Sequence, residues 1–110
     1  MLQKIAAETR NAGSEIIGAK GATHYGIGAT LVRIIRAILQ DEHAILAVSS
    51  RVPESLGLGD VSLSLPSIVD RNGIARVLSV PLSSSERKAL ETSAEVVKRG
   101  IAILAEAKPM

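Results

Sequence analysis

The segment from Lys20 to Gly28 holds the residue types in this chain that come nearest to a chemical site. It reads Lys-Gly-Ala-Thr-His-Tyr-Gly-Ile-Gly and lies between two helical patterns. The hydroxyl of Thr23 can cap the second helix or contact a polar ligand, and spacing alone favours capping. His24 belongs to the residue type that most often donates protons at neutral pH. No acidic residue lies at a spacing that would orient its ring, so we interpret His24 as a turn residue.

The glycines of this segment do not form a nucleotide-binding motif. Gly26-Ile27-Gly28 follows a helical pattern rather than a strand, and Leu31 stands where a dinucleotide fingerprint has its third glycine. The run from Gly18 to Thr23 likewise lacks the spacing of a P-loop. A tight turn between two helices explains these glycines.

A metal centre is not expected from the two histidines. His24 and His43 lack the sequence spacing of zinc ligands. His43 stands beside Asp41 and Glu42 at a predicted helix-to-strand junction. We expect it to be exposed and structural.

Two helices are predicted in the first 40 residues. Apolar residues recur at helical spacing over about residues 4–18, and Gly18 or Gly21 lies near the end of this helix. The second helix runs to about Gln40. Its apolar stripe is wide enough to predict a well-buried helix.

The middle of the chain predicts an antiparallel sheet of about three strands. Residues 44–48 form a short apolar run typical of a central strand, whereas residues 61–65 alternate strictly, as in a half-buried strand. Asn72-Gly73 is a hairpin turn signal that follows an arm at 68–69. The second arm is completed by residues 77–80.

The rest of the pattern predicts a third helix and sets the fold class. Ser83 and Glu86 have capping-box spacing before a long amphipathic stretch that Pro109 would end. The order helix, helix, strands, helix predicts an α+β fold in which three helices pack against the sheet. At 110 residues we expect one domain, residues 1–110.

Composition excludes several classes of function. The 13 basic and 11 acidic residues are spread along the chain, and the only aromatic residue is Tyr25, so a nucleic-acid partner is not expected. There is no cysteine to form a disulfide or a thiolate nucleophile. No signal peptide or membrane span is recognisable. A soluble cytoplasmic protein with no membrane partner is the expectation.

Several segments resemble the L-lactate and malate dehydrogenase family. In chain order they are residues 10–17 (Arg-Asn-Ala-Gly-Ser-Glu-Ile-Ile), 20–28, 60–66 and 70–74, followed by Ser93-Ala94-Glu95 in the last predicted helix. Together they extend over nearly the whole chain. The chain resembles the C-terminal substrate domain of this family and is most similar to that of bacterial L-lactate dehydrogenase.

The resemblance implies the function of a complete parent enzyme, which is reversible hydride transfer between NADH and pyruvate or a similar 2-oxo acid. The N-terminal nucleotide-binding domain of the family, with the catalytic histidine, aspartate and arginines, is absent from these 110 residues. The resemblance therefore assigns no catalytic residue and implies that the isolated chain neither binds NAD nor turns over substrate. It makes Thr23 a substrate-binding residue, reversing the preference for capping. It places Ile27 near the nicotinamide of the cofactor.

Two alternatives remain open. Ser14 stands where many relatives carry a bulky aromatic residue, so a larger 2-oxo acid is an alternative to pyruvate, and malate dehydrogenase is an alternative within the family. The alternative from another class is a noncatalytic, self-associating module, because removal of a partner domain would expose apolar surface. Both readings imply a homo-oligomer.

Overall fold

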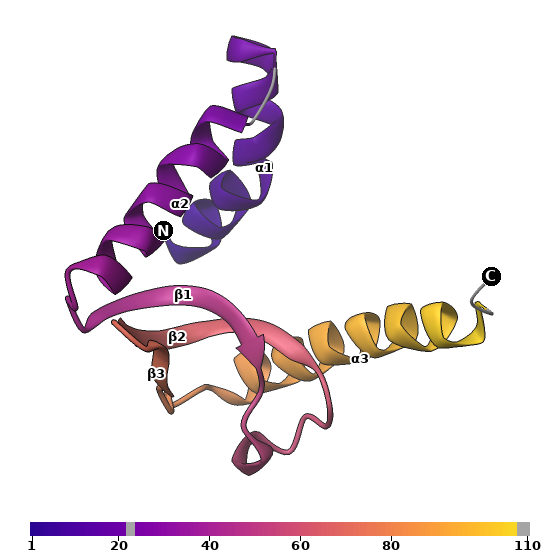
Figure 1. The fold of residues 1–110 in the computed structure, drawn as a ribbon. Helices are drawn as coiled ribbons and strands as arrows, with labels where there is room; N and C mark the ends of the chain where they lie inside the picture. Colours follow the sequence, from indigo (N-terminus) through magenta and orange to yellow (C-terminus); the bar gives the residue numbers. More distant parts are fainter. Residues whose placement is uncertain (22–23, 108–110) are drawn as a thin grey trace. The chain divides into compact units, whose positions relative to one another are not determined.

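The computed structural model describes residues 1–21 and 24–107. It divides into two compact units, Met1–Arg36 and Ala37–Met110. In chain order the elements are α1 (Leu2–Lys20), α2 (His24–Leu39), β1 (Ala44–Arg51), the 3-10 turn η1 (Glu54–Leu56), β2 (Ser62–Asp70), β3 (Gly73–Val77) and α3 (Ser84–Glu106), as drawn in Figure 1. The predicted combination of three α-helices with a three-stranded antiparallel sheet is confirmed.

The first helix ends at the second of the two predicted glycines. Gly21 adopts a left-handed conformation, with φ of 79°, and its N–H donates to the carbonyl of Ile17 at 2.7 Å. Glycine reaches this conformation without steric cost, so it is the usual residue just after a helix end. Gly18 lies inside α1.

The second helix forms as predicted, but its apolar stripe is not well buried. Ile27, Leu31 and Ile35 are 58%, 52% and 50% exposed, and Ala37 is the one buried residue that α2 contributes within the described part of the chain. Among the described residues of the unit Met1–Arg36, α1 is the only element besides α2. A single neighbouring helix cannot cover so wide a stripe. No helix in the described residues is both long and apolar enough to cross a membrane.

The second unit is built on the sheet, whose strand order is β1-β2-β3. The prediction of a central strand at residues 44–48 is wrong, because β1 is an edge strand and β2 is central. Side chains along β1 alternate between half-buried and exposed, and Ile45 is 64% exposed. A continuous apolar run of this length is compatible with a strand that is buried on only one face. It does not by itself show burial on both faces.

The hairpin forms one residue earlier than its turn signal suggests. Asp70 pairs with Gly73, so Arg71 and Asn72 form the loop, and Gly73 opens β3 with φ of 91°. The strand predicted at 61–65 and the hairpin arm predicted at 68–69 belong to one continuous strand, β2, which begins at Ser62 and runs through Pro66. Beyond the end of β3, the N–H of Leu78 still donates to the carbonyl of Pro66, at 2.8 Å.

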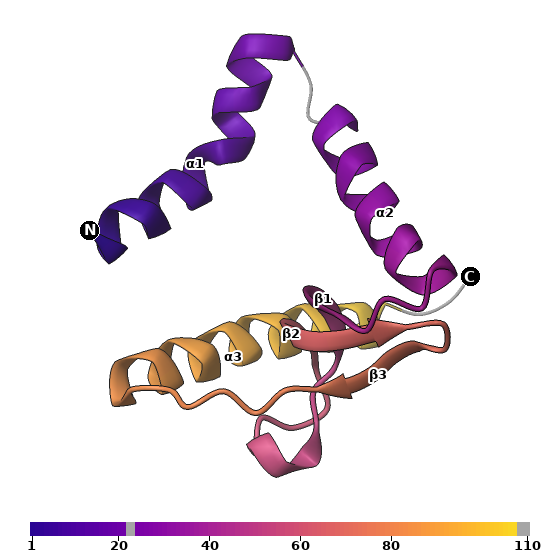
Figure 2. The ribbon, with the colours of Figure 1, turned by 90° about the vertical axis from the view of Figure 1, so that its left-hand side faces the viewer.

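The core of the second unit lies where α3 meets β2 and the loop between β1 and β2. Its buried members are aliphatic, and partly buried leucines and valines pack around them: Val52, Leu58, Val61 and Ala94, with Leu56, Leu63, Leu65, Leu90 and Val97. Figure 2 shows α3 running along one face of the sheet. The predicted capping box is confirmed, because the N–H of Glu86 donates to Ser83 Oγ and the N–H of Ser83 donates to Glu86 Oε2.

Candidate functional site

An open apolar groove lies between the two helices of the first unit. Its volume is about 360 Å³, and it is lined by Gly13, Ile16, Gly26, Ile27, Thr30 and Leu31. A Cβ at Gly26 would lie 3.9 Å from Ile16 Cδ1, an ordinary van der Waals distance, so α1 and α2 are in side-chain contact at this position. The groove is wide open to solvent and carries no charged side chain. It can therefore offer an apolar wall but cannot orient an ionic ligand.

The predicted site residues have different outcomes. Thr23, the predicted substrate-binding residue, lies outside the described residues. Ile27 lines the groove, on the first part of α2. His24 is the first residue of α2 rather than a turn residue, and its ring lies 4.5 Å from that of Tyr25, centroid to centroid.

The described residues do not form a dinucleotide cradle. Gly26, Ile27 and Gly28 lie inside α2, as the sequence pattern indicated, whereas a pyrophosphate is bound by a glycine-rich turn between a strand and a helix N-terminus. The three strands of the described chain pair antiparallel, with no parallel crossover among them. These residues therefore do not fit NAD as a self-sufficient binding site, and Ile27 can supply only an apolar contact.

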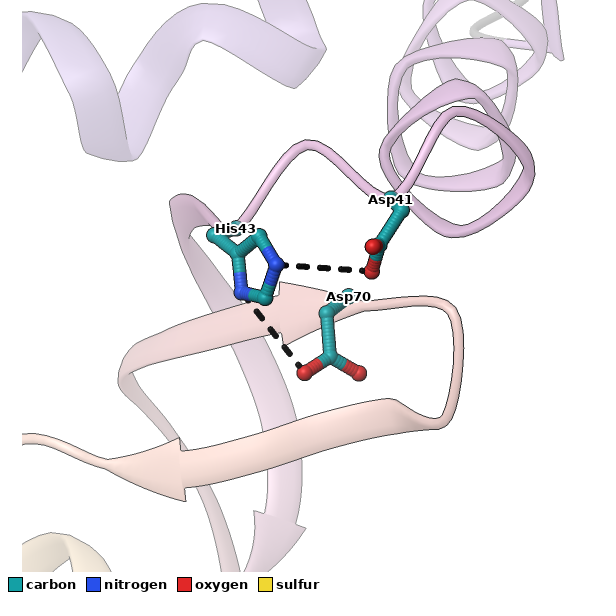
Figure 3. Close-up of side chains that lie close together, drawn as sticks. All are labelled: Asp41, His43 and Asp70. Carbon is teal, nitrogen blue, oxygen red and sulfur yellow. Dashed lines mark ion pairs between the residues drawn. The ribbon is translucent and has the colours of Figure 1, made fainter.

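A second group of side chains gathers in the other unit, where α2 leads into β1 and β2 ends (Figure 3). His43 lies between two carboxylates. Its Nε2 is 3.5 Å from Asp41 Oδ1, and its Nδ1 is 3.7 Å from Asp70 Oδ2. The His43 side chain is exposed, as predicted, but it is not isolated: it joins a cluster of three potential ligand side chains.

Hydrogen bonds from the hairpin loop hold the two carboxylates. The N–H of Arg71 donates to Asp41 Oδ1 at 3.1 Å, and the N–H of Asn72 donates to Asp70 Oδ1 at 2.8 Å. The hydrogen bond from the Arg71 N–H is the main cause that lowers the pKa of the Asp41 carboxyl below its usual range. The Arg71 guanidinium, 3.1 Å from Asp41 Oδ2, and the nearby His43 lower it further.

Sequence reasoning missed this cluster because Asp70 is distant in sequence. The signal that would have found it is the strand register. Ala44, which follows His43, pairs with Val69, which precedes Asp70, so the two side chains come from neighbouring positions at the same end of the strand pair. Without that register the sequence offers only Asp41 and Glu42 as neighbours of His43.

The second unit also contains an apolar cavity of about 250 Å³ between β2, the segment after β3 and the start of α3. It is lined by Leu56, Leu65, Pro66, Leu78, Val80, Leu82, Glu86 and Leu90. Glu86 is the only charged residue of the lining, and its carboxylate already accepts the capping hydrogen bond from Ser83. The cavity therefore offers a ligand apolar contacts and no charged group other than this capping carboxylate.

Known proteins resemble this chain in sequence. Residues 1–107 match the family model of the lactate/malate dehydrogenase α/β C-terminal domain. The chain is 50% identical over 102 residues to an L-lactate dehydrogenase of Nitratidesulfovibrio vulgaris, covering 93% of this chain and 33% of that enzyme. It is 43% identical over 106 residues to an L-lactate dehydrogenase of Kosmotoga olearia, again covering 33% of the enzyme. The chain thus spans about a third of the length of these curated relatives.

Solved structures give the same match. The L-lactate dehydrogenase of Clostridium thermocellum superposes with a TM-score of 0.83 at 39% identity, covering 97% of this chain and 36% of that one. The malate dehydrogenase of Aeropyrum pernix superposes with a TM-score of 0.80 at 28% identity, covering 89% of this chain and 33% of that one.

Proposed function

This chain belongs to the lactate/malate dehydrogenase family as its α/β C-terminal domain, and we propose that it forms the substrate-side part of an NAD-dependent L-2-hydroxyacid dehydrogenase acting on pyruvate or a similar 2-oxo acid. The observation that carries the proposal is the 50% identity over 93% of the chain to an L-lactate dehydrogenase. We further propose a cytoplasmic location for the enzyme.

Three tasks define the proposed reaction, and this chain supplies part of one. The substrate carboxylate must be bound, a proton must pass to or from the substrate oxygen, and the reacting carbon must be held in line for hydride transfer. The groove beside Ile27 can contribute an apolar wall to the third task. Thr23 is proposed to contact the substrate. NAD, which accepts and donates the hydride, is bound by the remainder of the proposed enzyme.

The 110 residues alone are therefore proposed to be inactive. In the described part of the chain, the candidate site holds neither an arginine positioned for a carboxylate nor an acid-oriented histidine beside Ile27, since the histidine that contacts carboxylates is His43 in the other unit. Titration of the isolated chain with NADH, followed by fluorescence, is expected to give no saturable micromolar binding. Saturable binding would contradict this part of the proposal.

A chimera tests the proposed activity directly. The 102 matched residues of the Nitratidesulfovibrio vulgaris L-lactate dehydrogenase would be replaced by the corresponding residues of this chain. We expect NADH oxidation in the presence of pyruvate, with a bulkier 2-oxo acid and oxaloacetate assayed in parallel to define the preferred substrate. A chimera that folds and binds NADH but reduces none of the three would refute the proposal.

A specific observation also supports the alternative of a self-associating module. Large aliphatic side chains of the first unit are exposed, among them Ile5, Ile17, Ile27 and Leu31, each at 50% or more. Apolar surface of this kind is typical of subunit contacts. We propose that the chain forms a homo-oligomer, to be tested by sedimentation equilibrium over a dilution series. A folded monomer at every concentration would contradict it.

A further inference from the structure

We propose that Asp41, His43 and Asp70 form a binding site for a divalent transition-metal ion of the zinc class, which joins the junction between α2 and β1 to the β2–β3 hairpin. Each of the three side chains offers one ligand atom, and these atoms all lie within 4.8 Å of one another. The three residues lie in the unit Ala37–Met110, so the site depends on the fold of that unit alone.

The spacing of the ligand atoms is close to what zinc requires. Zinc binds imidazole nitrogen and carboxylate oxygen at about 2.0 to 2.2 Å, so two ligand atoms on a tetrahedral ion lie about 3.3 to 3.6 Å apart. His43 Nε2 lies 3.5 Å from Asp41 Oδ1, and His43 Nδ1 lies 3.7 Å from Asp70 Oδ2 (Figure 3). One nitrogen already lies within 4.8 Å of an oxygen of each carboxylate, and rotation of the His43 side chain, which is 62% exposed, can bring it closer.

The carboxylate of Asp70 independently points to a cation. Asp70 is only 8% exposed, and its Oδ1 accepts the hydrogen bond from the Asn72 N–H at 2.8 Å. Within the described part of the chain, the partner of its Oδ2 is His43 Nδ1 at 3.7 Å, which is longer than a hydrogen bond. A buried carboxylate is costly unless it is paired or bound to a metal. We therefore assign Oδ2 as a ligand atom.

The hairpin loop holds both carboxylates in place. The N–H of Arg71 donates to Asp41 Oδ1 at 3.1 Å, and the Arg71 guanidinium lies 3.1 Å from Asp41 Oδ2. Carboxylates that bind metals are commonly oriented by such an outer layer of hydrogen bonds. A carboxylate oxygen that accepts one hydrogen bond keeps a second lone pair, so Asp41 Oδ1 can still bind the ion. The loop thus presents preformed ligands.

The ligand types select the ion. Imidazole nitrogen suits zinc and other first-row transition metals, whereas magnesium and calcium prefer ligands that are all oxygen. Two carboxylates balance the charge of a divalent ion. The side chains of His43 and Asp41 are 62% and 29% exposed, so water can reach the ion as a fourth ligand. We therefore expect Zn²⁺ to bind and Mg²⁺ not to compete.

The pairing of the strands explains why the sequence did not indicate this site. The spacing of His24 and His43 gave no expectation of a metal centre, and only His43 belongs to the cluster. The third ligand, Asp70, comes from β2, where the register of the strand pair brings it near His43.

Isothermal titration calorimetry with Zn²⁺ tests the site in the full 110-residue chain, prepared without a histidine tag. We expect saturable one-to-one binding in the micromolar range. His43→Asn and Asp70→Asn should each weaken it by at least about tenfold, because even the loss of an outer partner of a metal ligand costs about 10- to 100-fold. Asparagine tolerates the positive φ of His43, and at position 70 it retains the Oδ1 acceptor for the Asn72 N–H.

Circular dichroism verifies that the variants are folded, and Asp41→Asn provides the same test if Asp70→Asn does not fold. His24→Asn and Asp60→Asn are the matched controls. They remove the other histidine and an exposed aspartate that pairs with Arg51, and both should bind Zn²⁺ as the parent does.

A second readout locates the ion. On addition of Zn²⁺ to the parent, the amide resonances of residues 41–43 and 70–72 should shift, and millimolar Mg²⁺ should not reverse the shifts. The proposal is overturned if Zn²⁺ gives no saturable binding, or if folded His43→Asn binds it as tightly as the parent. Displacement of Zn²⁺ by Mg²⁺, or resonance shifts confined to other residues, would also overturn it.

Discussion

Arg87, in the first part of α3, donates a hydrogen bond from its guanidinium to the main-chain carbonyl of Leu56, 31 residues earlier in the sequence. Its Nε also donates to Glu91 Oε1 at 2.9 Å, which fixes the plane of the guanidinium. The carbonyl belongs to η1, in the loop that carries Leu58 into the core. The Arg87 side chain thus links α3 to the loop that contributes Leu58 to the core.

We expect Arg87→Lys to destabilise the second unit by about 1 to 2 kcal/mol, because lysine retains the charge but cannot make both directed hydrogen bonds. Urea unfolding followed by circular dichroism measures the loss. Arg99→Lys is the control, on an exposed part of the same helix. Equal stability of the two variants would show that the contact with Leu56 contributes nothing.

The capping box gives a prediction for acid pH. The hydrogen bond from the Ser83 N–H, with the hydroxyl of Ser83, lowers the pKa of Glu86 below its ordinary 4.5. A carboxyl with a lowered pKa in the folded state stabilises the fold above its unfolded-state pKa, and this stabilisation is lost as the pH falls through the folded-state pKa. We therefore expect Glu86→Gln to be less stable than the parent at neutral pH and the difference to shrink below about pH 4.5.

Unfolding measured at intervals from pH 6 to pH 3 checks this expectation. Glu106→Gln, at the far end of α3, is the control and should follow the parent throughout. The Asp41 carboxyl also has a lowered pKa and remains in both variants, so it does not affect the comparison. A constant difference between parent and Glu86→Gln at every pH would contradict the assignment.

Two glycines should respond in opposite directions to alanine. Gly73 has φ of 91° in the hairpin, a conformation that strains any residue with a Cβ, so Gly73→Ala should destabilise the fold by about 1 kcal/mol or more. Gly100 lies within α3, and apart from its chain neighbours and the adjacent backbone of the helix, no atom lies within 4 Å of the position its Cβ would take. Gly100→Ala should stabilise by about 0.5 to 1 kcal/mol, because alanine is the better helix former. Paired melting curves would reveal the opposite signs, and a shared sign would contradict the prediction.

The sequence predicted best where local rules decide the structure. The capping box of Ser83 and Glu86 and the glycine end of α1 each depend on a few adjacent residues, and both are confirmed. The prediction failed where the burial of a helix or strand depends on which other element packs against it. Residues 44–48 are apolar enough for a central strand, yet they form an edge, and the stripe of α2 is apolar enough for the interior, yet it is exposed.

The same distinction applies to the candidate sites. Thr23 and Ile27 were predicted from a resemblance, and local spacing alone would have made Thr23 a helix cap. The cluster around His43 was not predicted, because it requires the register that brings Asp70 opposite the start of β1. Periodicity gives the face of a strand but not which residue of another strand lies across from it.

In the chimera described above, Thr23→Gly separates a substrate contact from a helix cap. If the side chain shapes the substrate pocket, the ratio of kcat/KM for pyruvate to that for a branched 2-oxo acid should fall, since one methylene of fit is worth about 1 to 3 kcal/mol. A cap alone would lower the melting temperature by the loss of a few tenths to about 1 kcal/mol and leave the ratio unchanged. Steady-state kinetics beside a melting curve decide between the two.

Ile27 and Val32 provide a matched pair on α2. They are 58% and 56% exposed, but only Ile27 lines the groove between α1 and α2. If Ile27 forms the apolar wall near the cofactor, Ile27→Ala in the chimera should lower kcat/KM for NADH by about tenfold, because partial burial of the lost methylenes is worth about 1.4 kcal/mol. Val32→Ala should leave kcat/KM near the value of the unsubstituted chimera. Equal losses in both variants would indicate a general effect on α2 and would remove Ile27 from the proposed site.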